Sequence, residues 1–290
     1  MIGLQILASG ILLGGIYALI SVGLNLIFGV IKVVNMAHGD FLMLGMYAAY
    51  FLFTGLAISP YVSAIIIFPV FMVIGYVVFR LVVKPLLGKA ETETNTILAT
   101  SGLQFVLQNL VLMLFTADYR AIQLEGGATS FNIGGVMLSA NRTWAFLICL
   151  ILAVALYYIL MHTRLGAQVR AVSQDRDASV LMGINVDRIY ALTFCVGVAM
   201  VGLAGAIILP VFSAYPTVGT FFSTSSFVVV VLGGLGSFTG ALLGGLIIGI
   251  VETAAGVFAS TELAQVFSLL VFLIVLFVRP QGLLGKGARV

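Results

Sequence analysis

Residues 163–188, TRLGAQVRAVSQDRDASVLMGINVDR, form a polar segment in a chain that is otherwise strongly apolar. Seven of the chain's 23 charged side chains (13 basic plus 10 acidic) lie in this segment. Four of its residues recur at the spacing of one helix stripe: Ala171, Ala178, Leu181 and Met182. Gly183 is placed to end that helix, since glycine tolerates the left-handed conformation past a helix terminus. We interpret the segment as a docking surface for a soluble partner, with a solvated loop as the alternative.

The overall composition predicts a membrane protein. Hydrophobic residues make up 62% of the chain, charged residues 8%, and the mean hydropathy is +1.23. Apolar runs of about 20 residues, each enough to cross a bilayer core, recur along the chain. The apolar start, which continues to Gly29 without a basic region, is expected to be a retained span. We therefore expect an all-α, polytopic transmembrane bundle forming a single domain over residues 1–290.

The membrane spans can be placed from the apolar runs. They are predicted near 2–29, 37–57, 60–83, 96–116, 142–162, 189–213, 225–258 and 261–278. If the spans alternate, eleven basic residues share one side: Lys32, Arg80, Lys84, Lys89, Arg164, Arg170, Arg176, Arg188, Arg279, Lys286 and Arg289. Only Arg120 and Arg142 lie opposite. Because positive residues concentrate on the cytoplasmic side, we expect the N-terminus outside, and the polar segment and the C-terminus in the cytoplasm.

This orientation constrains the long apolar region 225–258. Six spans return the chain to the outside near Ala214, while Arg279 must be inside, so residues 216–278 cross an odd number of times. The glycines of LGGLGS, residues 232–237, allow a sharp bend. We expect either a tight hairpin between two crossings or a re-entrant pair of half-helices. Unwound backbone in a membrane must be covered, so the break is expected to face the protein interior.

Glycines at helix spacing predict close helix packing. They are Gly10, Gly14, Gly240, Gly244, Gly245 and Gly249. Small residues four apart let two helix backbones approach closely in a membrane, and we favour this role over one in transport. Glu252 is the one acid well inside a predicted span. It is either functional or paired with a backbone or hydroxyl group.

A polar interruption, NMAHGD at residues 35–40, separates the first two predicted spans. One interpretation is structural, because Asp40 in the first turn of a helix is favoured by the macrodipole. The functional interpretation is that Asn35, His38 and Asp40 line a helix break where a polar solute finds hydrogen bonds. Gln104 and Gln108, one turn apart in the fourth span, either join helices or face an aqueous path, and we favour the first.

The sequence lacks the motifs expected for ATP binding, metal binding, disulfide formation or catalysis. The chain has no G-x-x-x-x-G-K-[ST] phosphate loop, so ATP is not expected to bind to it. Cys149 and Cys195 lie in separate spans, and His38 has no second residue at metal-ligand spacing. No combination of nucleophile, base and orienting acid stands out, so we expect no catalytic residues, no metal and no enzyme activity of the chain alone.

Four motifs in order resemble the LivH-type permeases of branched-chain amino acid ABC importers, and the resemblance spans nearly the whole chain. They are GLNLIFGVIKVVNMAHGDFLMLGMYAAY (23–50), RAVSQDRDASVLMGINVDR (170–188) followed by ALTF, VLGGLGSFTGALLGGLIIGIVE (231–252) and FVRPQGLLG (277–285). The resemblance implies a subunit of the bacterial inner membrane that pairs with a second permease, identical or paralogous. Two cytoplasmic ATPases, which bind the ATP, and a periplasmic solute-binding protein would complete the importer.

The resemblance also assigns roles to residues. The segment from Arg170 to Gly183 is similar to the segment that contacts the ATPase, which implies coupling roles for Arg170, Gln174, Asp175, Asp177, Leu181 and Gly183. Together with the polar interruption and the bend, it suggests a substrate pathway along Asn35, His38, Gly39, Asp40, Gln104, Gly233, Gly234, Gly236 and Ser237. ATP binding would move the polar segment and, with it, the flanking spans.

The sequence does not decide the substrate among several classes. Amino-acid permeases of this type often carry a lysine shortly before the VLGG motif, where this chain has FSTSSF at residues 222–227. Branched-chain or other hydrophobic amino acids are expected, with urea, short amides, aromatic carboxylates or sugars as alternatives. Two other classes remain open: a channel or secondary carrier that works without ATP, and an assembly scaffold that transports nothing.

Overall fold

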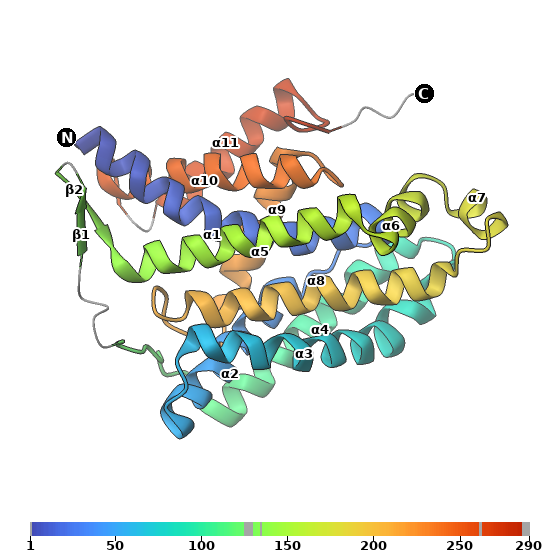
Figure 1. The fold of residues 1–290 in the computed structure, drawn as a ribbon, viewed down its shortest axis with the longest axis horizontal. Helices are drawn as coiled ribbons and strands as arrows, with labels where there is room; N and C mark the ends of the chain where they lie inside the picture. The colour runs from blue at the N-terminus through green and yellow to red at the C-terminus, as the bar shows by residue number, and fades with distance from the viewer. Residues whose placement is uncertain (1, 125–129, 134, 261–262, 286–290) are drawn as a thin grey trace.

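The protein is a helical bundle with one short β-hairpin (Figure 1). The computed structural model describes residues 2–124, 130–133, 135–260 and 263–285. Its longer helices are α1 (Ile2–Ile31), α2 (His38–Leu56), α3 (Pro60–Val78), α4 (Thr92–Phe115), α5 (Ala140–His162), α8 (Val186–Ile208), α9 (Val218–Gly233), α10 (Phe238–Phe258) and α11 (Ala264–Val278). The shorter elements are η1 (Phe79–Val83), η2 (Lys84–Leu86), β1 (Ser130–Ile133), β2 (Val136–Ser139), α6 (Arg164–Gln174) and α7 (Arg176–Leu181).

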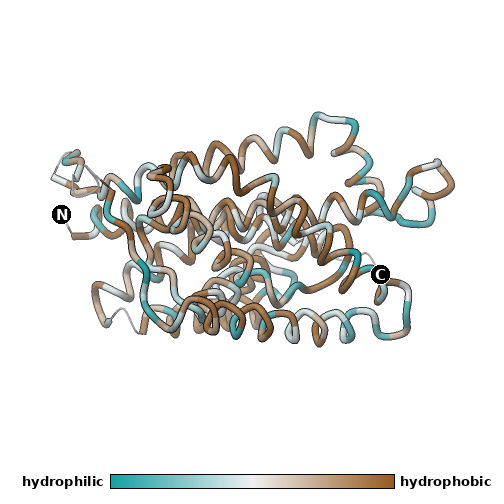
Figure 2. The backbone as a smooth tube through the Cα atoms, turned by 90° about the horizontal axis from the view of Figure 1, so that it is seen from below, coloured by the Kyte–Doolittle hydropathy of each residue, from teal (hydrophilic) through white to brown (hydrophobic). Residues whose placement is uncertain are grey.

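The predicted fold class is confirmed. Among the described residues, seven helical segments are long and apolar enough to cross a membrane: α1, α2, α3 with its extension to Leu86, α4, α5, α8 and α10. The apolar helices α9 and α11 are shorter. Figure 2 shows hydrophobic colour along most of the helices, with strongly hydrophilic stretches mainly near the two ends of the bundle. The β-hairpin lies at one end and α6 and α7 at the other (Figure 1), and we call these the hairpin end and the coupling end.

Helices α1 and α10 pack against each other through their glycines. Gly14 lies so close to α10 that an added Cβ would be 2.7 Å from the Cα of Leu246. An added Cβ on Gly10 would meet the Cα of Ile250 at the same distance. Gly249 in turn faces the backbone of Gly14. The packing role expected for these glycines is therefore confirmed, and the two helices run antiparallel with their backbones in contact.

Helix α8 is enclosed by α1, α2 and α3. Its small residues allow these neighbours to approach from several sides: an added Cβ on Gly75 of α3 would lie 2.9 Å from the Cα of Cys195. Gly45 of α2 makes a similar approach to Gly202. Because α8 directly follows the polar segment 163–188, any displacement of that segment acts on the most enclosed part of the bundle.

Three helices follow α8, namely α9, α10 and α11, and of these α10 is long and apolar enough to cross a membrane. The odd number of crossings predicted for residues 216–278 stays a prediction. The bend is the tight hairpin of the two alternatives, between Gly233 and Phe238. Gly234 (φ +105°) and Gly236 (φ +81°) adopt conformations that favour glycine. The turn lies at the coupling end of the bundle, where Leu235 is exposed. The expectation that it faces the protein interior was wrong for this residue, since the turn joins helix ends and interrupts no helix within the apolar layer.

The polar segment departs from its predicted form. One amphipathic helix was expected, but the chain forms two, α6 and α7, because Asp175 interrupts the helix with extended backbone (φ −149°, ψ 109°). The Asp175 carboxylate accepts a hydrogen bond from the Ala178 N–H at 2.9 Å and so caps α7. Gly183 follows the end of α7 with φ +79°, as predicted. The stripe from Ala171 to Met182 is consequently not continuous.

Glu252 joins three helices at one buried position. Its carboxylate accepts hydrogen bonds from the Tyr17 hydroxyl of α1 at 2.5 Å and the Ser268 hydroxyl of α11 at 3.0 Å. All three residues are buried. Of the two interpretations of this acid, the pairing with hydroxyl groups is therefore observed. Each carboxylate oxygen has one donor, which offsets part of the desolvation of a buried acid.

Replacing Tyr17 with phenylalanine should destabilise the permease by about 1 to 2 kcal/mol, because one Glu252 oxygen loses its donor in a buried site. Thermal unfolding of the purified chain in detergent measures the change. Tyr61→Phe is the matched control, since the Tyr61 hydroxyl has no hydrogen-bond partner within the described residues. Equal effects of the two substitutions would show that the Tyr17–Glu252 bond contributes nothing.

Candidate solute pathway and coupling surface

The chain between α1 and α2 is unwound and enters the bundle. Asn35, His38 and Asp40 are all buried, with Asp40 0% exposed. The unwound backbone is covered by side chains from other helices: Thr100 of α4 accepts from the Met36 N–H at 3.1 Å. Ser223 of α9 accepts from the Gly39 N–H at 2.8 Å. The predicted helix break is therefore present, and Asp40 lies in the first turn of α2 as expected.

Asp40 is the centre of a network that joins α2, α4 and α9. Gln108 of α4 donates to Asp40 Oδ1 at 2.8 Å, and its Nε2 also lies 2.9 Å from the hydroxyl of Thr220 on α9. Gln104, one turn earlier, lies 3.4 Å from the same hydroxyl. The two glutamines thus join helices, as the favoured interpretation held.

The same network reaches the outer surface of the chain. Thr220 is exposed, and Gln104 and Gln108 are half-buried on a helix whose neighbouring residues Phe105 and Val106 are exposed and apolar. Amide and hydroxyl groups facing hydrocarbon lose their hydrogen bonds to water, so such a strip is found where protein or a water-filled path covers it. We call Asp40, Gln104, Gln108, Thr220 and Ser223 the polar strip.

Several buried polar atoms beside the strip have no hydrogen-bond partner within the described residues. They are Asp40 Oδ2, His38 Nδ1 and both amide atoms of Asn35. The other nitrogen of His38, Nε2, lies 2.9 Å from the Ile20 carbonyl oxygen and donates to it, which leaves Nδ1 as an acceptor. Buried groups without partners are uncommon, and these four atoms lie in the unwound chain before α2 or in its first turn. Water or a polar solute could satisfy them.

The glycine turn expected in the same pathway lies elsewhere. Gly219, which packs against Asp40, and Gly233 are 14 positions apart in α9. That separation corresponds to about 21 Å along the helix axis. Gly236 and Ser237 instead bind Asn25 of α1: Asn25 accepts from the Gly236 N–H and donates to the Ser237 carbonyl oxygen, both at 2.6 Å. Asn35, His38, Gly39, Asp40 and Gln104 therefore form one group, and Gly233, Gly234, Gly236 and Ser237 another.

Four contributors to these contacts were missed in the sequence: Asn25, Thr100, Thr220 and Ser223. Each is a polar residue in an apolar helix, and that is the signal that could have identified them. Asn25 interrupts the first span, and Ser223 lies in FSTSSF. Hydroxyl residues often bond their own helix backbone, so the signal alone does not separate them from ordinary helix residues.

The polar segment 163–188 presents an exposed apolar tip. Leu181 is 87% and Met182 82% exposed, at the C-terminal end of α7. Gln174, Asp175 and Asp177 are also exposed. Arg170, by contrast, is half-buried and donates to the Leu160 carbonyl oxygen of α5, so it ties α6 to the bundle. Exposed apolar side chains beside charged ones are typical of a surface that another protein covers.

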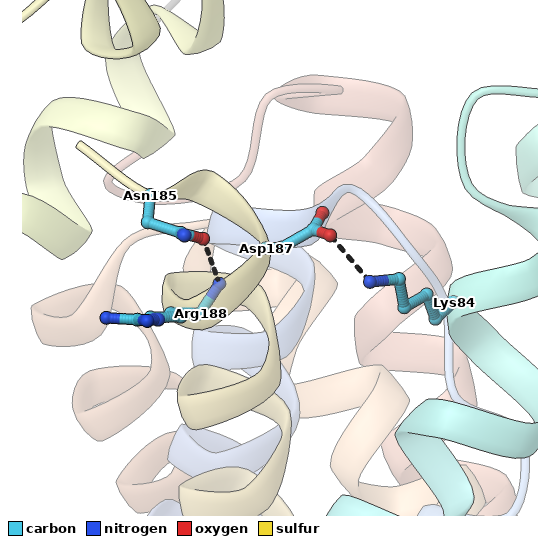
Figure 3. Close-up of polar contacts among 4 residues, drawn as sticks. All are labelled: Lys84, Asn185, Asp187 and Arg188. Carbon is cyan, nitrogen blue, oxygen red and sulfur yellow. Dashed lines mark hydrogen bonds and ion pairs between the residues drawn. The ribbon is translucent and has the colours of Figure 1, made fainter. Parts of the chain in front are cut away.

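The far end of the segment is tied to the bundle as well. The Asn185 side chain accepts a hydrogen bond from the Arg188 N–H at 3.0 Å and so caps α8 (Figure 3). Asp187 forms an ion pair with Lys84 of η2 at 2.6 Å, drawn in the same figure. Both ends of the segment are therefore anchored, at Arg170 and at Asp187, while its tip is free. Such an arrangement can transmit movement of the tip to α5 and α8.

An unwound entry to α2, a polar strip on an apolar surface and an anchored polar segment between spans together define a multi-pass membrane protein of the transporter class. Residues 6–276 match the family described as the permease component of the branched-chain amino acid transport system. The chain belongs to this family, as the resemblance implied.

Individual relatives agree with this assignment. The chain is 31% identical over 301 residues to the high-affinity branched-chain amino acid transport system permease protein BraD of Pseudomonas aeruginosa, covering 98% of this chain and 96% of BraD. It is 29% identical over 304 residues to the corresponding protein LivH of Escherichia coli K12, with the same coverage. The solved structure of PsaBC from Streptococcus pneumoniae in complex with Fab is similar in fold, with a TM-score of 0.52, 11% identity and coverage of 95% and 92%.

Proposed function

We propose that the chain is the membrane-spanning subunit of an ATP-driven importer for branched-chain or other hydrophobic amino acids. The observation that carries the proposal is the polar strip around Asp40, which places hydrogen-bonding groups on the surface of an apolar bundle in a chain of the branched-chain amino acid permease family. The names of BraD and LivH support the substrate class.

The proposal includes partners. A second permease, identical or paralogous, would cover the polar strip, so that solute passes between two chains and not through lipid. Two ATPases would bind the exposed tip at Leu181 and Met182, and an external binding protein would deliver solute at the hairpin end. The chain itself has no phosphate loop, so ATP would be bound by the partners.

The orientation follows from the basic residues. Arg142 lies in the first turn of α5 and Arg120 between α4 and β1, and Figure 1 shows these parts of the chain at the hairpin end. The other described lysines and arginines lie in or beside η1, η2, α6, α7, the start of α8 and the ends of α1 and α11, which lie toward the coupling end. The positive-inside rule then places the coupling end in the cytoplasm of a bacterial cell and the N-terminus outside. In this orientation the exposed tip meets cytoplasmic ATPases, and Gly183, which follows α7 with φ +79°, turns the chain back toward α8.

Movement would start at the tip. Closure of the ATPases on ATP would displace α6 and α7, and the anchors at Arg170 and Asp187 would pass the displacement to α5 and α8. Since α8 packs against α2, whose first turn holds Asp40, the displacement reaches the polar strip. Such coupling requires that ATP and solute favour different conformations of the same bundle.

Reconstitution tests this function. The assembled importer in liposomes should accumulate labelled leucine only with ATP and the binding protein present on their proper sides. Uptake without ATP would instead indicate a channel or carrier, and no flux would indicate a scaffold. Calorimetry of the binding protein with leucine, urea, a short amide, benzoate and ribose then identifies the solute, and binding of any but the amino acid would contradict the proposed substrate.

Replacing Gln108 with leucine should reduce ATP-driven uptake about tenfold, because Asp40 loses its donor and a polar position on the strip becomes apolar. The initial rate of leucine uptake in liposomes measures the effect. Asn109→Leu is the control: Asn109 is exposed, and among the described residues its side chain bonds only the Phe105 carbonyl oxygen of its own helix. Equal losses in both variants would contradict a role of the polar strip in transport.

A further inference from the structure

A charged cavity lies at the coupling end, between the polar segment and the membrane-spanning helices. Its volume is about 400 Å³, within the range of small-molecule sites, and it opens to solvent. The lining comes from α1, η2, α4, α7 and α8 and from the turns that follow α1 and η2. The lining residues are Ile31, Lys32, Lys84, Leu87, Gly88, Thr92, Glu93, Arg176, Asp187 and Tyr190. None of these residues belongs to the polar strip, and the transport mechanism proposed above assigns the cavity no ligand.

The cavity has an excess of positive charge. Three basic side chains face two acidic ones, which leaves a formal charge of +1. Lys84 is neutralised by Asp187, with its nitrogen 2.6 Å from the carboxylate. Within the described residues this is the one ion pair, so Lys32 and Arg176 have no ionic partner there. Glu93 is the remaining acid, exposed in the first turn of α4.

Backbone geometry adds to the case for an anion. Lys32 directly follows the last residue of α1 with φ +59°, the left-handed conformation common just past a helix end, where the chain turns along the cavity. The N-terminus of α4, at Thr92, opens on the same cavity, and the partial positive charge of a helix N-terminus favours an anion.

We propose that this cavity binds a phosphate group, with Lys32 and Arg176 as its charged contacts. A singly charged phosphodiester balances the formal charge of +1, whereas a zwitterionic amino acid leaves it uncompensated. In the orientation proposed above the cavity lies at the cytoplasmic membrane surface, where basic pockets between helices bind anionic lipid headgroups. The apolar side chains of Ile31 and Leu87 in the lining suit the glycerol and first acyl carbons next to a lipid phosphate, and free phosphate is the other source of the same chemistry.

A bound phosphate would connect the moving and the fixed parts of the chain. Arg176 is the first residue of α7, and Lys32 directly follows the last residue of α1. One anion in contact with both would hold α7 against the bundle. The occupant would thereby limit the displacement of α7 that the importer requires. This consequence rests on the proposed function, whereas the binding of phosphate can be measured without any transport.

Binding is tested on the assembled, delipidated complex in a nonionic detergent. Thermophoresis is measured with dihexanoyl-phosphatidylglycerol, inorganic phosphate, dihexanoylglycerol and leucine. The phosphatidylglycerol should bind, and dihexanoylglycerol, which lacks the phosphate, should not. Inorganic phosphate binding equally well would identify a soluble ion as the source. Binding of leucine alone, or of no phosphate compound, would overturn the assignment.

Two matched pairs of variants locate the site. Lys32→Gln should weaken binding about threefold to fivefold, the effect of one charge at a partly exposed site, while Arg80→Gln, outside the cavity, should not. Glu93→Gln should strengthen binding by a similar factor, and Glu91→Gln, two residues away and outside the cavity, should not. Equal effects within both pairs would mean that the lipid senses only net charge, and would overturn the cavity as the site. Because the second pair strengthens binding, a folding defect in Lys32→Gln does not decide the result.

Discussion

Replacing Gly249 with valine should remove most of the folded permease from the membrane. Gly249 packs directly on the backbone of Gly14, and an added Cβ would overlap backbone atoms, which cannot rotate away as a side chain can. Helices α1 and α10 would have to separate along their contact. Overpacking of a well-packed interior costs about 1 to 3 kcal/mol when neighbours can adjust, and this contact allows little adjustment.

The amount of monodisperse protein after detergent extraction measures this effect, by fluorescence-detected size exclusion of a tagged chain. Gly102→Val is the matched control: Gly102 also lies in a membrane-spanning helix, α4, but nothing lies within 4 Å of an added Cβ there. The control substitution changes the helix propensity by the same amount and adds the same side chain. If both variants gave equal yields near that of the parent chain, the α1–α10 contact would not limit folding.

The glycine pattern shows how far the sequence predicts this fold. Small residues four apart indicated that α1 and α10 pack closely with some partner, because the spacing repeats on one helix face. It did not indicate that the two helices pair with each other, since Gly14 and Gly249 are separated by most of the chain. Pairing between distant helices depends on which surfaces fit, and a local pattern carries no information on that.

For the polar strip too, the sequence predicted the local feature but not the residues that pack against it. The interruption NMAHGD predicted the break before α2 because the polar side chains of Asn35, His38 and Asp40 interrupt the apolar pattern there. Its partners could not be predicted: the Gly39 N–H bonds Ser223, 184 residues away. The sequence indicated that the Gln108 amide needs a hydrogen-bond partner within its span. Only the fold shows that this partner is Asp40.

The prediction of one helix in the polar segment was wrong for a local reason. Periodicity favoured one helix because Ala171 and Leu181 fall on the same stripe, and that pattern outweighed the aspartate between them. Asp175 is a strong N-cap residue, and its carboxylate does cap Ala178. Capping residues inside a periodic segment thus signal a helix boundary that periodicity alone does not detect. The break matters for function, because it separates the anchored helix α6 from the exposed α7.

Replacing Leu181 with aspartate should abolish ATP-driven uptake while the chain still folds. Leu181 is 87% exposed, so the permease alone loses no packing, whereas a partner that covers this tip would have to bury a new charge. Loss of a central apolar contact costs about 2 kcal/mol or more, which weakens an interface about 30-fold. Co-purification of the ATPases and solute-stimulated ATP hydrolysis measure the loss. Leu284→Asp is the control, since Leu284 is exposed near the coupling end but lies outside the polar segment. Retention of ATPases by the Leu181 variant, with normal uptake, would contradict the coupling role of α7.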